Sequence, residues 1–419
     1  MSPVCRAAAI AIAVVLVGAI ASAQEPVGCE LDDLVIACEA LGSPRAQLLT
    51  GTTIAGSEAT GEALSQAIAL ELATAPFGSS SGGFTFTFES DTRAWRRTAG
   101  TFGPAFAERA LTIGRGRFSA GFNFIRRSYD SFDELDLDSF EIFRFQGGAL
   151  PVTSSVFGLE SSSETFAGFA HFGVLDTVDV GVVVPYIRFH IAGTSRLFGA
   201  AGQEVQRVRI DSSASGIGDI AVFGKIRIMG WGPEPAAGAE PHGGLALAAT
   251  VRLPTGNEDD LLGLGITRTH FQAIASATFG RWSPHGNIGY EVWSAGFPVP
   301  RDFQGLETVS AKDQVHVAAG VEYEVHPRLT VIGDVLSRYL RGAGGIGYQE
   351  FVFPPNRPDV AGATALVAVP DGVLTMIAAP GMKWNVFGNT LLSADLLIAV
   401  SGRGLRDRIT PVIGIDIGL

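Results

Sequence analysis

Charged and polar side chains recur at every second position along much of this 419-residue chain. Lys225 and Arg227 share one face of an extended segment, whereas Ile226 and Ile228 share the other. A period of two is that of a β-strand with one polar and one apolar face. If many such strands close into a barrel that lies in lipid, the polar side chains at every second position must point into the lumen. There they could control the passage of a solute.

The side chains predicted to line the lumen carry charges of both signs. Two interpretations therefore stay open, because these groups could border a wet pore or could pair across strands and fill it. The predicted set is Asp219, Lys225, Arg227, Arg252, Arg268, His270, Gln272, Glu291, His316, Glu322, Glu324, Asp334, Arg338, Lys383, Asp395, Arg408 and Asp416.

Enzyme motifs are weak in this sequence. Gly78–Gly82 fits G-x-S-x-G around Ser80, but a nucleophile elbow needs a strand before the serine and a helix after it. Here a helix-like segment precedes the serine and a strand-like segment follows it. The seven histidines show no Ser/His/acid grouping on one outer face. The sequence thus predicts no enzyme, no catalytic residue, no metal site and no cofactor.

The elements that would position the lumen side chains are long alternating strands. Gln314–Val325 alternates over a dozen residues, and the His326–Pro327 turn leads into a second strand from Arg328. Twelve such segments are expected, and the count becomes fourteen if Phe84–Phe88 pairs with a strand near 97–103. The twelve are 117–128, 163–174, 178–191, 216–228, 244–254, 266–279, 285–295, 313–325, 328–340, 372–385, 389–401 and 408–419.

The connections alternate in length, with one exception at 230–243. Short periplasmic turns and long external loops are typical of a transmembrane β-barrel. A soluble β-sandwich has no reason to place its long loops at one end. The expected fold class is therefore all-β, an antiparallel outer-membrane barrel. Short connections are expected at 175–177, 280–284, 326–327 and 386–388, and long ones at 129–162, 192–215, 255–265, 296–312 and 341–371.

The N-terminus predicts export. Arg6 precedes an apolar run over 7–20 and the small residues Ala21-Ser22-Ala23, which is the order of a cleaved signal peptide. An uncleaved anchor is the alternative, although the run is shorter than the roughly 20 residues a spanning helix needs. The expected division is a signal peptide over 1–23, a periplasmic or plug region with a short helix over 24–80, and a barrel over 81–419. Secretion through a signal peptide and a barrel fold together place the chain in the bacterial outer membrane.

Two cysteines remain after such cleavage. Cys29 and Cys38 lie close together in a compartment that permits disulfides, so a bridge is expected, with two unpaired thiols as the alternative. The net charge of −12 and the lack of a Lys/Arg cluster argue against nucleic acid as a partner. Residues 257–260 form an acidic cluster that is either a solvated loop or a site for calcium-bridged lipopolysaccharide.

Five strings of the sequence resemble outer-membrane proteins of the MetA-pathway phenol-degradation family, which are similar to channels for fatty acids and aromatic hydrocarbons. The resemblance covers roughly residues 80–419 and implies a barrel that admits small hydrophobic or aromatic compounds. No plug motif of the better-defined hydrocarbon channels can be matched near the N-terminus. The strings are Phe106–Arg117, Val178–Pro185, Gly216–Lys225, Val251–Gly265 and Gly404–Gly414.

The function expected from these features is a porin-like outer-membrane transporter for passive uptake of small hydrophobic or aromatic molecules. A structural or adhesive barrel with a closed lumen is the alternative, and a barrel lipid hydrolase is a weaker third. The expected partners are outer-membrane lipid and lipopolysaccharide, small hydrophobic solutes and the barrel-assembly machinery.

Overall fold

The computed structural model describes most of the chain with side chains. The described residues are 30–32, 35–38, 43–54, 58–78, 86–89, 94–97, 101–133, 135–146, 153–231, 242–300, 308–342, 345–351, 362–369 and 371–418. The predicted signal peptide and Cys29 lie outside these ranges, and the side chain of Cys38 is not described. The expected disulfide therefore stays a prediction.

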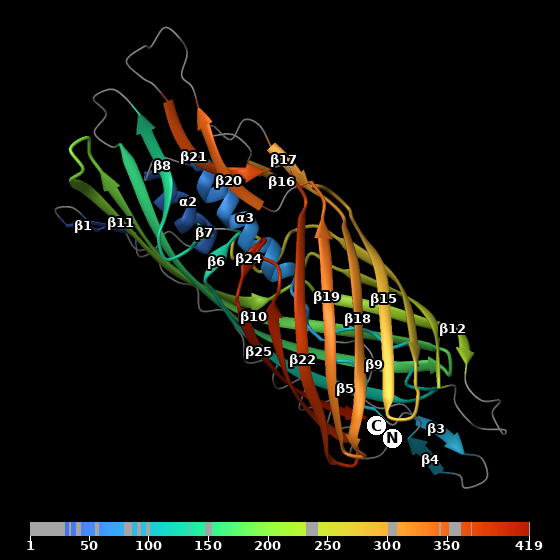
Figure 1. Cartoon of the computed structure of the whole chain (residues 1–419). Coiled ribbons are helices and arrows are strands. Elements are labelled where there is room, and N and C mark those ends of the chain that lie inside the picture. Colours follow the sequence, from blue (N-terminus) through green and yellow to red (C-terminus); the bar gives the residue numbers. More distant parts are fainter. Residues whose placement is uncertain are drawn as a thin grey trace.

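Twelve antiparallel strands pair in a closed ring, in which the last strand, β25, pairs with the first, β5. Figure 1 shows the resulting barrel. A closed ring leaves no edge strand, and this satisfies every backbone group of the wall in lipid. The strands of the ring are β5 (Phe118–Tyr129), β9 (Ser154–Leu175), β10 (Val178–Phe198), β12 (Ala221–Trp231), β13 (Gly243–Arg252), β14 (Arg268–Ala277), β15 (Trp282–Trp293), β18 (Gln314–His326), β19 (Leu329–Leu340), β22 (Val373–Phe387), β23 (Thr390–Ala399) and β25 (Ile409–Gly418).

The outer face of the ring is apolar and the inner face is polar. On β19, Val331 and Val335 are exposed, whereas Asp334 on the opposite face is buried. The same alternation holds on β25, where Ile413 and Ile417 are exposed and Thr410 is buried. A continuous apolar outer wall requires lipid around it. The barrel thus spans a membrane, and its architecture is that of the bacterial outer membrane.

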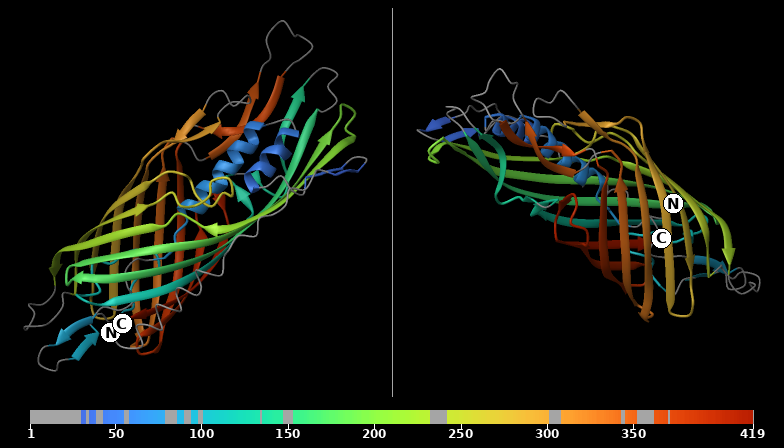
Figure 2. Two further views of the ribbon diagram at one scale, coloured as in Figure 1. Left: turned by 180° about the vertical axis from the view of Figure 1, so that it is seen from behind. Right: turned by 45° about the horizontal axis from the view of Figure 1, so that its top comes forward.

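The wall continues beyond the membrane at the end where the long connections were expected, here called the loop end. Further strands extend β9 and β10 there, so several expected loops are in fact paired strands (Figure 2). Small ribbons lie beside them. These strands are β1 (Glu30–Asp32), β2 (Val35–Cys38), β6 (Ser131–Phe132), β7 (Leu135–Asp136), β8 (Phe140–Gln146), β11 (Glu204–Ile217), β16 (Phe297–Pro300), β17 (Thr308–Ala311), β20 (Gly345–Phe351), β21 (Gly362–Val369) and β24 (Leu405–Arg406).

Two helices, α2 (Pro44–Ile54) and α3 (Glu58–Thr74), are enclosed by the extended strands. The stretch 61–75 lacks a helix breaker and is rich in Ala, Leu, Glu and Gln, all strong helix formers. Pro76 follows the end of α3 and cannot continue it. Leu64 and Ile68 of α3 join one apolar core with Phe157 of β9 and Ile191 of β10. Neither helix is long and apolar enough to cross a bilayer, within the residues that the structure describes.

The twelve-strand prediction is confirmed and the fourteen-strand alternative is wrong. β3 (Phe86–Glu89) pairs with β4 (Ala94–Arg97) in a separate two-stranded sheet, so neither strand joins the ring. The first strand of the ring begins at Phe118, and residues 101–113 before it lie in the lumen, bonded to side chains of the wall. The N-terminal helical region expected from the sequence is present, and it contains the two helices α2 and α3. The exceptional connection at 230–243 lies mostly outside the described residues.

Candidate functional site in the barrel lumen

The lumen contains part of the chain's own N-terminal region. One element is the C-terminal end of α3, here called the helix end and comprising Glu71–Thr74. The other is the irregular stretch Thr101–Ile113, here called the lumen segment. Pro104 of this segment has no N–H and Gly103 has a φ of +79°, so the segment cannot pair as a regular strand. Its backbone groups must find partners among the side chains of the wall.

Wall carboxylates supply acceptors for the N–H groups of the lumen segment. Asp334 Oδ2 accepts from the backbone nitrogens of Ala105, Phe106 and Ala107 at 3.2, 2.9 and 3.1 Å. Glu322 Oε2 accepts from the Gly103 nitrogen at 2.9 Å. Hydrogen bonds to an ionised acceptor are roughly twice as strong as neutral ones. These two carboxylates therefore hold the middle of the lumen segment against β18 and β19.

Amide and ammonium groups complete the attachment. Asn287 Oδ1 accepts from the Glu108 nitrogen at 2.7 Å, and Asn287 Nδ2 donates to the Glu108 carbonyl at 2.9 Å. Lys383 Nζ donates to the Pro104 carbonyl at 2.7 Å, and Lys225 Nζ donates to the Arg109 carbonyl at 3.4 Å. Donors and acceptors of the segment are thus bound from opposite sides of the barrel.

The far end of the lumen segment is held by Asp179 of β10. Its two carboxylate oxygens lie 3.3 and 3.1 Å from the Ile113 nitrogen. Asp179 is buried, as is Lys225 at 4.0 Å from it. The segment therefore crosses the lumen, from the β18–β19 wall to the β10–β12 wall.

Three lumen arginines bind the helix end. Arg268 Nη2 donates to the Ala73 carbonyl at 2.9 Å, and Arg252 Nη1 donates to the same oxygen at 3.1 Å. Arg338 Nη1 donates to the Thr74 carbonyl at 3.2 Å and to the Thr74 hydroxyl. The last carbonyls of a helix lack internal partners and carry partial negative charge, which cations stabilise.

Ion pairs surround these arginines. Arg338 Nη2 lies 2.9 Å from Glu71 Oε2 of the same helix end. Arg268, which is 1% exposed, lies 3.4 Å from Asp219 Oδ2 and 3.7 Å from Glu291 Oε1. The buried guanidinium of Arg268 is therefore balanced by two carboxylates, as a buried charge requires.

His285 lies behind Asp334 and Glu322, the two carboxylates that hold the lumen segment. His285 Nε2 lies 2.9 Å from Asp334 Oδ1, and His285 Nδ1 lies 3.6 Å from Glu322 Oε1. Gly320 faces this pair, because a Cβ there would lie 2.2 Å from Asp334 Oδ1. The lack of a side chain at Gly320 thus leaves room for Asp334 and His285.

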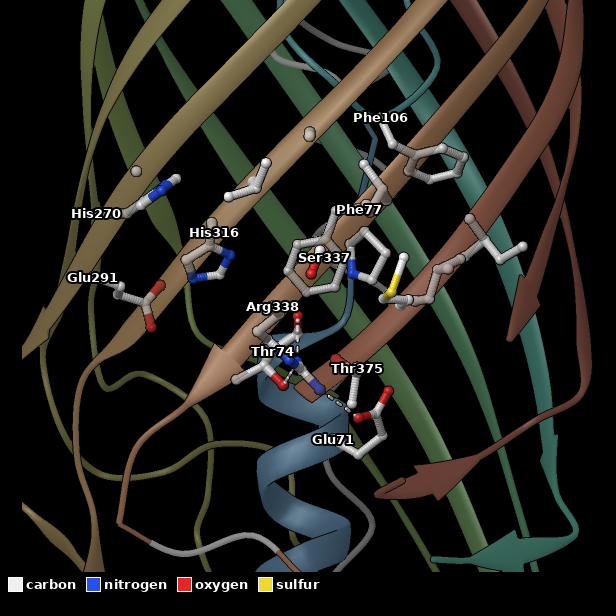
Figure 3. Close-up of a pocket in the computed structure, with 18 of the residues that line it drawn as sticks. Glu71, Thr74, Phe77, Phe106, His270, Glu291, His316, Ser337, Arg338 and Thr375 are labelled. Carbon is white, nitrogen blue, oxygen red and sulfur yellow. Dashed lines mark hydrogen bonds and ion pairs between the residues drawn. The ribbon is translucent and has the colours of Figure 1, made fainter. Parts of the chain in front are cut away.

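A chamber of about 250 Å³ lies between the helix end and the lumen segment (Figure 3). Phe77 and Phe106 border it on one side, and Glu291 with His270 and His316 border it on another. The two imidazole rings are 4.6 Å apart. The chamber therefore offers an apolar surface and a polar surface to one small solute.

The predicted lumen residues divide into three sets. Those that bind the helix end or the lumen segment are Lys225, Arg252, Arg268, Glu322, Asp334, Arg338 and Lys383. Those that border the chamber without such a bond are His270, Gln272, Glu291 and His316. Those placed elsewhere are Asp219, Arg227, Glu324, Asp395, Arg408 and Asp416, and Arg408 is exposed at the start of β25. None of these placements tests a role in passage, so the pore-lining role stays a prediction.

Four side chains that hold the lumen segment, support Asp334 or border the chamber were not in the predicted set. Asp179 alternates with valines in 178–185 and could have been found by the same period of two. Asn287 lies in the expected strand 285–295 and alternates with the outward Ile288, so the same period of two could have found it. His285 was expected at the very start of the strand 285–295, whereas β15 begins at Trp282 and His285 is buried within it. Arg127 on β5 also faces the lumen and borders the chamber.

The acidic cluster at 257–260 lies in a connection at the loop end. Asn257 Nδ2 donates to Asp260 Oδ2 at 2.8 Å, and the Asp259 nitrogen donates to Asn257 Oδ1 at 3.1 Å. Desolvation raises the pKa of the Asp260 carboxyl, although the Asn257 hydrogen bond opposes this. The cluster at 257–260 is thus a turn with hydrogen bonds among its own residues. Among the residues that the structure describes, no three His, Cys, Asp or Glu side chains group as metal ligands.

Comparison with known proteins agrees with the class that the fold and lumen define, an outer-membrane β-barrel of the channel type. A family model described as "Putative MetA-pathway of phenol degradation" matches residues 143–353, and the chain belongs to this family. The expected resemblance is thereby confirmed. No curated protein matches the sequence.

Three solved structures with similar folds are outer-membrane channels. An outer-membrane channel from Pseudomonas putida F1 is 12% identical, with a TM-score of 0.43 over 74% of this chain and 98% of that chain. The channel DcaP of Acinetobacter baumannii is 9% identical, with a TM-score of 0.28 over 73% and 96%. The CymD monoaromatic hydrocarbon channel is 9% identical, with a TM-score of 0.31 over 73% and 88%.

Proposed function

We propose that this protein is an outer-membrane channel for passive diffusion of small hydrophobic or aromatic molecules, and that its own N-terminal region is the plug. The observation that carries the proposal is the chamber, which lies inside a closed barrel between two elements held by polar side chains. A chamber bordered by Phe77 and Phe106 on one side and by imidazoles on the other suits a single aromatic ring with one polar substituent. Movement would follow the concentration gradient, with no cofactor.

Two features support a plug that can be displaced. The lumen segment has no regular hydrogen-bonded structure of its own, so its attachment depends on side chains such as Asp334 and Asn287. The helix end is attached through side chains as well. Side-chain hydrogen bonds exchange readily with water, each at a net cost of about 0.5–3 kcal/mol. A modest rearrangement of the plug would join the chamber to both ends of the barrel.

A structural barrel with a closed lumen is the second candidate. The Arg268 network favours it, because that guanidinium is bound to Ala73, Asp219 and Glu291 at once. Catalysis is not expected from this site, since the fold and the family are those of channels. That the protein is not an enzyme stays a prediction.

Uptake separates the two candidates. Labelled phenol would be followed into intact bacterial cells that lack general porins, with and without this protein in their outer membrane. We expect faster uptake in cells that contain the protein. Cells with Val335→Arg should take up phenol no faster than cells without the protein, because this substitution would keep the barrel from assembling in lipid. Equal uptake in cells with and without the folded protein would support the structural barrel.

The position of the barrel in the outer membrane indicates which lipids and proteins contact its outer surface. Lipid surrounds the exposed apolar wall. We infer that lipopolysaccharide contacts the loop end and that the barrel-assembly machinery recognises β25, whose outward side chains are Pro411 and isoleucines. Loss of folded barrel after replacement of Ile415 and Ile417 by serine, with retention after replacement of the lumen-facing Thr410, would support the second inference.

A further inference from the structure

Arg127 is a buried guanidinium whose terminal nitrogens have no partner among the described residues. Its side chain is 4% exposed, and both Nη1 and Nη2 are buried without a hydrogen bond. A buried cation without an anion is strongly unfavourable unless water or a ligand completes it. Arg127 borders the chamber, so a ligand there can reach it.

The other arginines that border the chamber each have a described partner, including Arg403 beside Asp133 and Arg406 beside Ser131. Arg338 binds Glu71 and Thr74, and Arg252 binds the Ala73 carbonyl. The Asp407 carboxylate also borders the chamber, but it accepts from the Ser128 and Ile409 nitrogens and the Thr410 hydroxyl and makes no hydrogen bond to Arg127 Nη1 or Nη2. Arg127 is thus a cationic group in the chamber with capacity left for an anion.

An apolar wall begins one lumen position away on the same strand. Ile125 precedes Arg127 by two residues, so the two side chains share a face roughly 6–7 Å apart along β5. Ile125 belongs to an apolar cluster with Leu397, against which Phe77 and Phe106 pack. Phe77, Phe106 and Leu397 also border the chamber. A flat apolar group on this wall would place an attached anionic group at Arg127.

The size and charge of the chamber restrict the ligand further. Its volume of about 250 Å³ is below the roughly 300–1,000 Å³ of pockets that hold drug-sized ligands. One ring therefore fits better than two. Glu71, Glu291 and Asp407 also border the chamber and disfavour a dianion. Two adjacent guanidinium nitrogens match a planar carboxylate, which they bind in a bidentate manner.

We propose that the chamber is a binding site for a single-ring aromatic carboxylate, with the ring on the Phe77–Phe106–Leu397 wall and the carboxylate on Arg127. This inference rests on the proposed function, because it gives the solute of that channel a chemical class. The anion would provide the counter-charge that Arg127 lacks. A neutral aromatic of the same shape would leave the guanidinium unpartnered and would bind less tightly.

The test is calorimetric titration of the refolded full-length protein in detergent with benzoate and with benzamide, its neutral isostere. We expect benzoate to bind at least tenfold more tightly than benzamide. Arg127→Met should remove this preference and lower benzoate affinity at least tenfold. The matched control is Arg126→Met, because Arg126 is the adjacent arginine on the outward face of the same strand. It should change neither affinity more than twofold.

The inference is overturned if benzoate binds Arg127→Met as tightly as it binds the unaltered protein, or if the unaltered protein does not prefer benzoate to benzamide. The second criterion does not depend on the folding of any variant. Phenol uptake by intact cells with and without the protein separates this result from the proposed function. Increased uptake without benzoate preference overturns the carboxylate site alone, whereas benzoate preference without increased uptake overturns the channel alone.

Discussion

The carboxylate of Asp334 accepts the backbone N–H of Phe106 at 2.9 Å. The same oxygen accepts from the residues on either side of Phe106, so one wall side chain holds three successive peptide groups. Its other oxygen lies 2.9 Å from His285 Nε2. The strand alternation that puts valines on the lipid side of β19 therefore places this carboxylate on the lumen side, where it holds the lumen segment.

The space beside this anchor leads to the first prediction. Gly320→Ala would put a Cβ 2.2 Å from Asp334 Oδ1 and 2.5 Å from His285 Nε2. Over-packing of this kind typically destabilises by about 1–3 kcal/mol. We expect Gly320→Ala to unfold at a lower urea concentration than the unaltered protein. Unfolding is monitored by the heat-dependent shift in gel mobility. Gly333→Ala on the paired strand is the control, since a Cβ there meets nothing within 4 Å. Equal midpoints for the two variants would contradict the packing at Gly320.

The helix end leads to the second prediction. Arg338→Met removes the bonds to the Thr74 carbonyl and to Glu71. A cation at a helix C-terminus contributes about 0.3–2 kcal/mol. We expect amide hydrogen exchange in Glu58–Thr74 to become faster, by up to roughly thirtyfold at the upper value. Arg328→Met should leave this exchange unchanged, because Arg328 lies in the exposed turn after β18. Unchanged exchange in Arg338→Met would mean that the arginine does not hold the helix.

The apolar wall leads to the third prediction. Val335 is 45% exposed near the middle of β19, and an arginine there should cost about 2–4 kcal/mol in lipid. We expect a poor yield of folded Val335→Arg on refolding into vesicles. Val400→Arg should refold normally, because Val400 is exposed beyond the end of β23. Normal refolding of both variants would contradict the assigned position of the bilayer.

Sequence periodicity predicted the ring of strands well for a physical reason. Lipid outside and polar groups inside force alternation on every spanning strand, and alternation is visible in the sequence. The 97–103 stretch shows why the strand count was less secure. The backbone nitrogens of Phe102 and Gly103 donate to the Thr330 and Glu322 side chains, and no sequence period predicts such bonds.

The roles of the lumen charges could be predicted only in part. Arg252, Arg268 and Arg338 donate to carbonyl oxygens of α3, and every residue type possesses such an oxygen. Backbone acceptors leave no compositional signal. Extension of the wall by β8, β11, β20 and β21 was missed because those strands are covered on one side by helices and core. Their pattern therefore departs from that of a lipid-facing strand.

The central claim is that the lumen segment closes a channel and can be released. Single-channel recording in a planar bilayer tests it, with the unaltered protein compared with Asp334→Ala. The substitution removes the acceptor of three N–H groups and the partner of His285, and each lost buried bond costs about 1–3 kcal/mol. Glu324→Ala is the control, since Glu324 lies on the neighbouring strand β18 and has no side-chain bond to the described lumen segment.

The account predicts that the unaltered protein and Glu324→Ala stay closed for most of a recording and that Asp334→Ala shows frequent, stepwise openings. Silence from Asp334→Ala, with the barrel confirmed as folded, would contradict a releasable plug and favour the structural barrel. Steady ohmic conduction by the unaltered protein would contradict closure by the lumen segment.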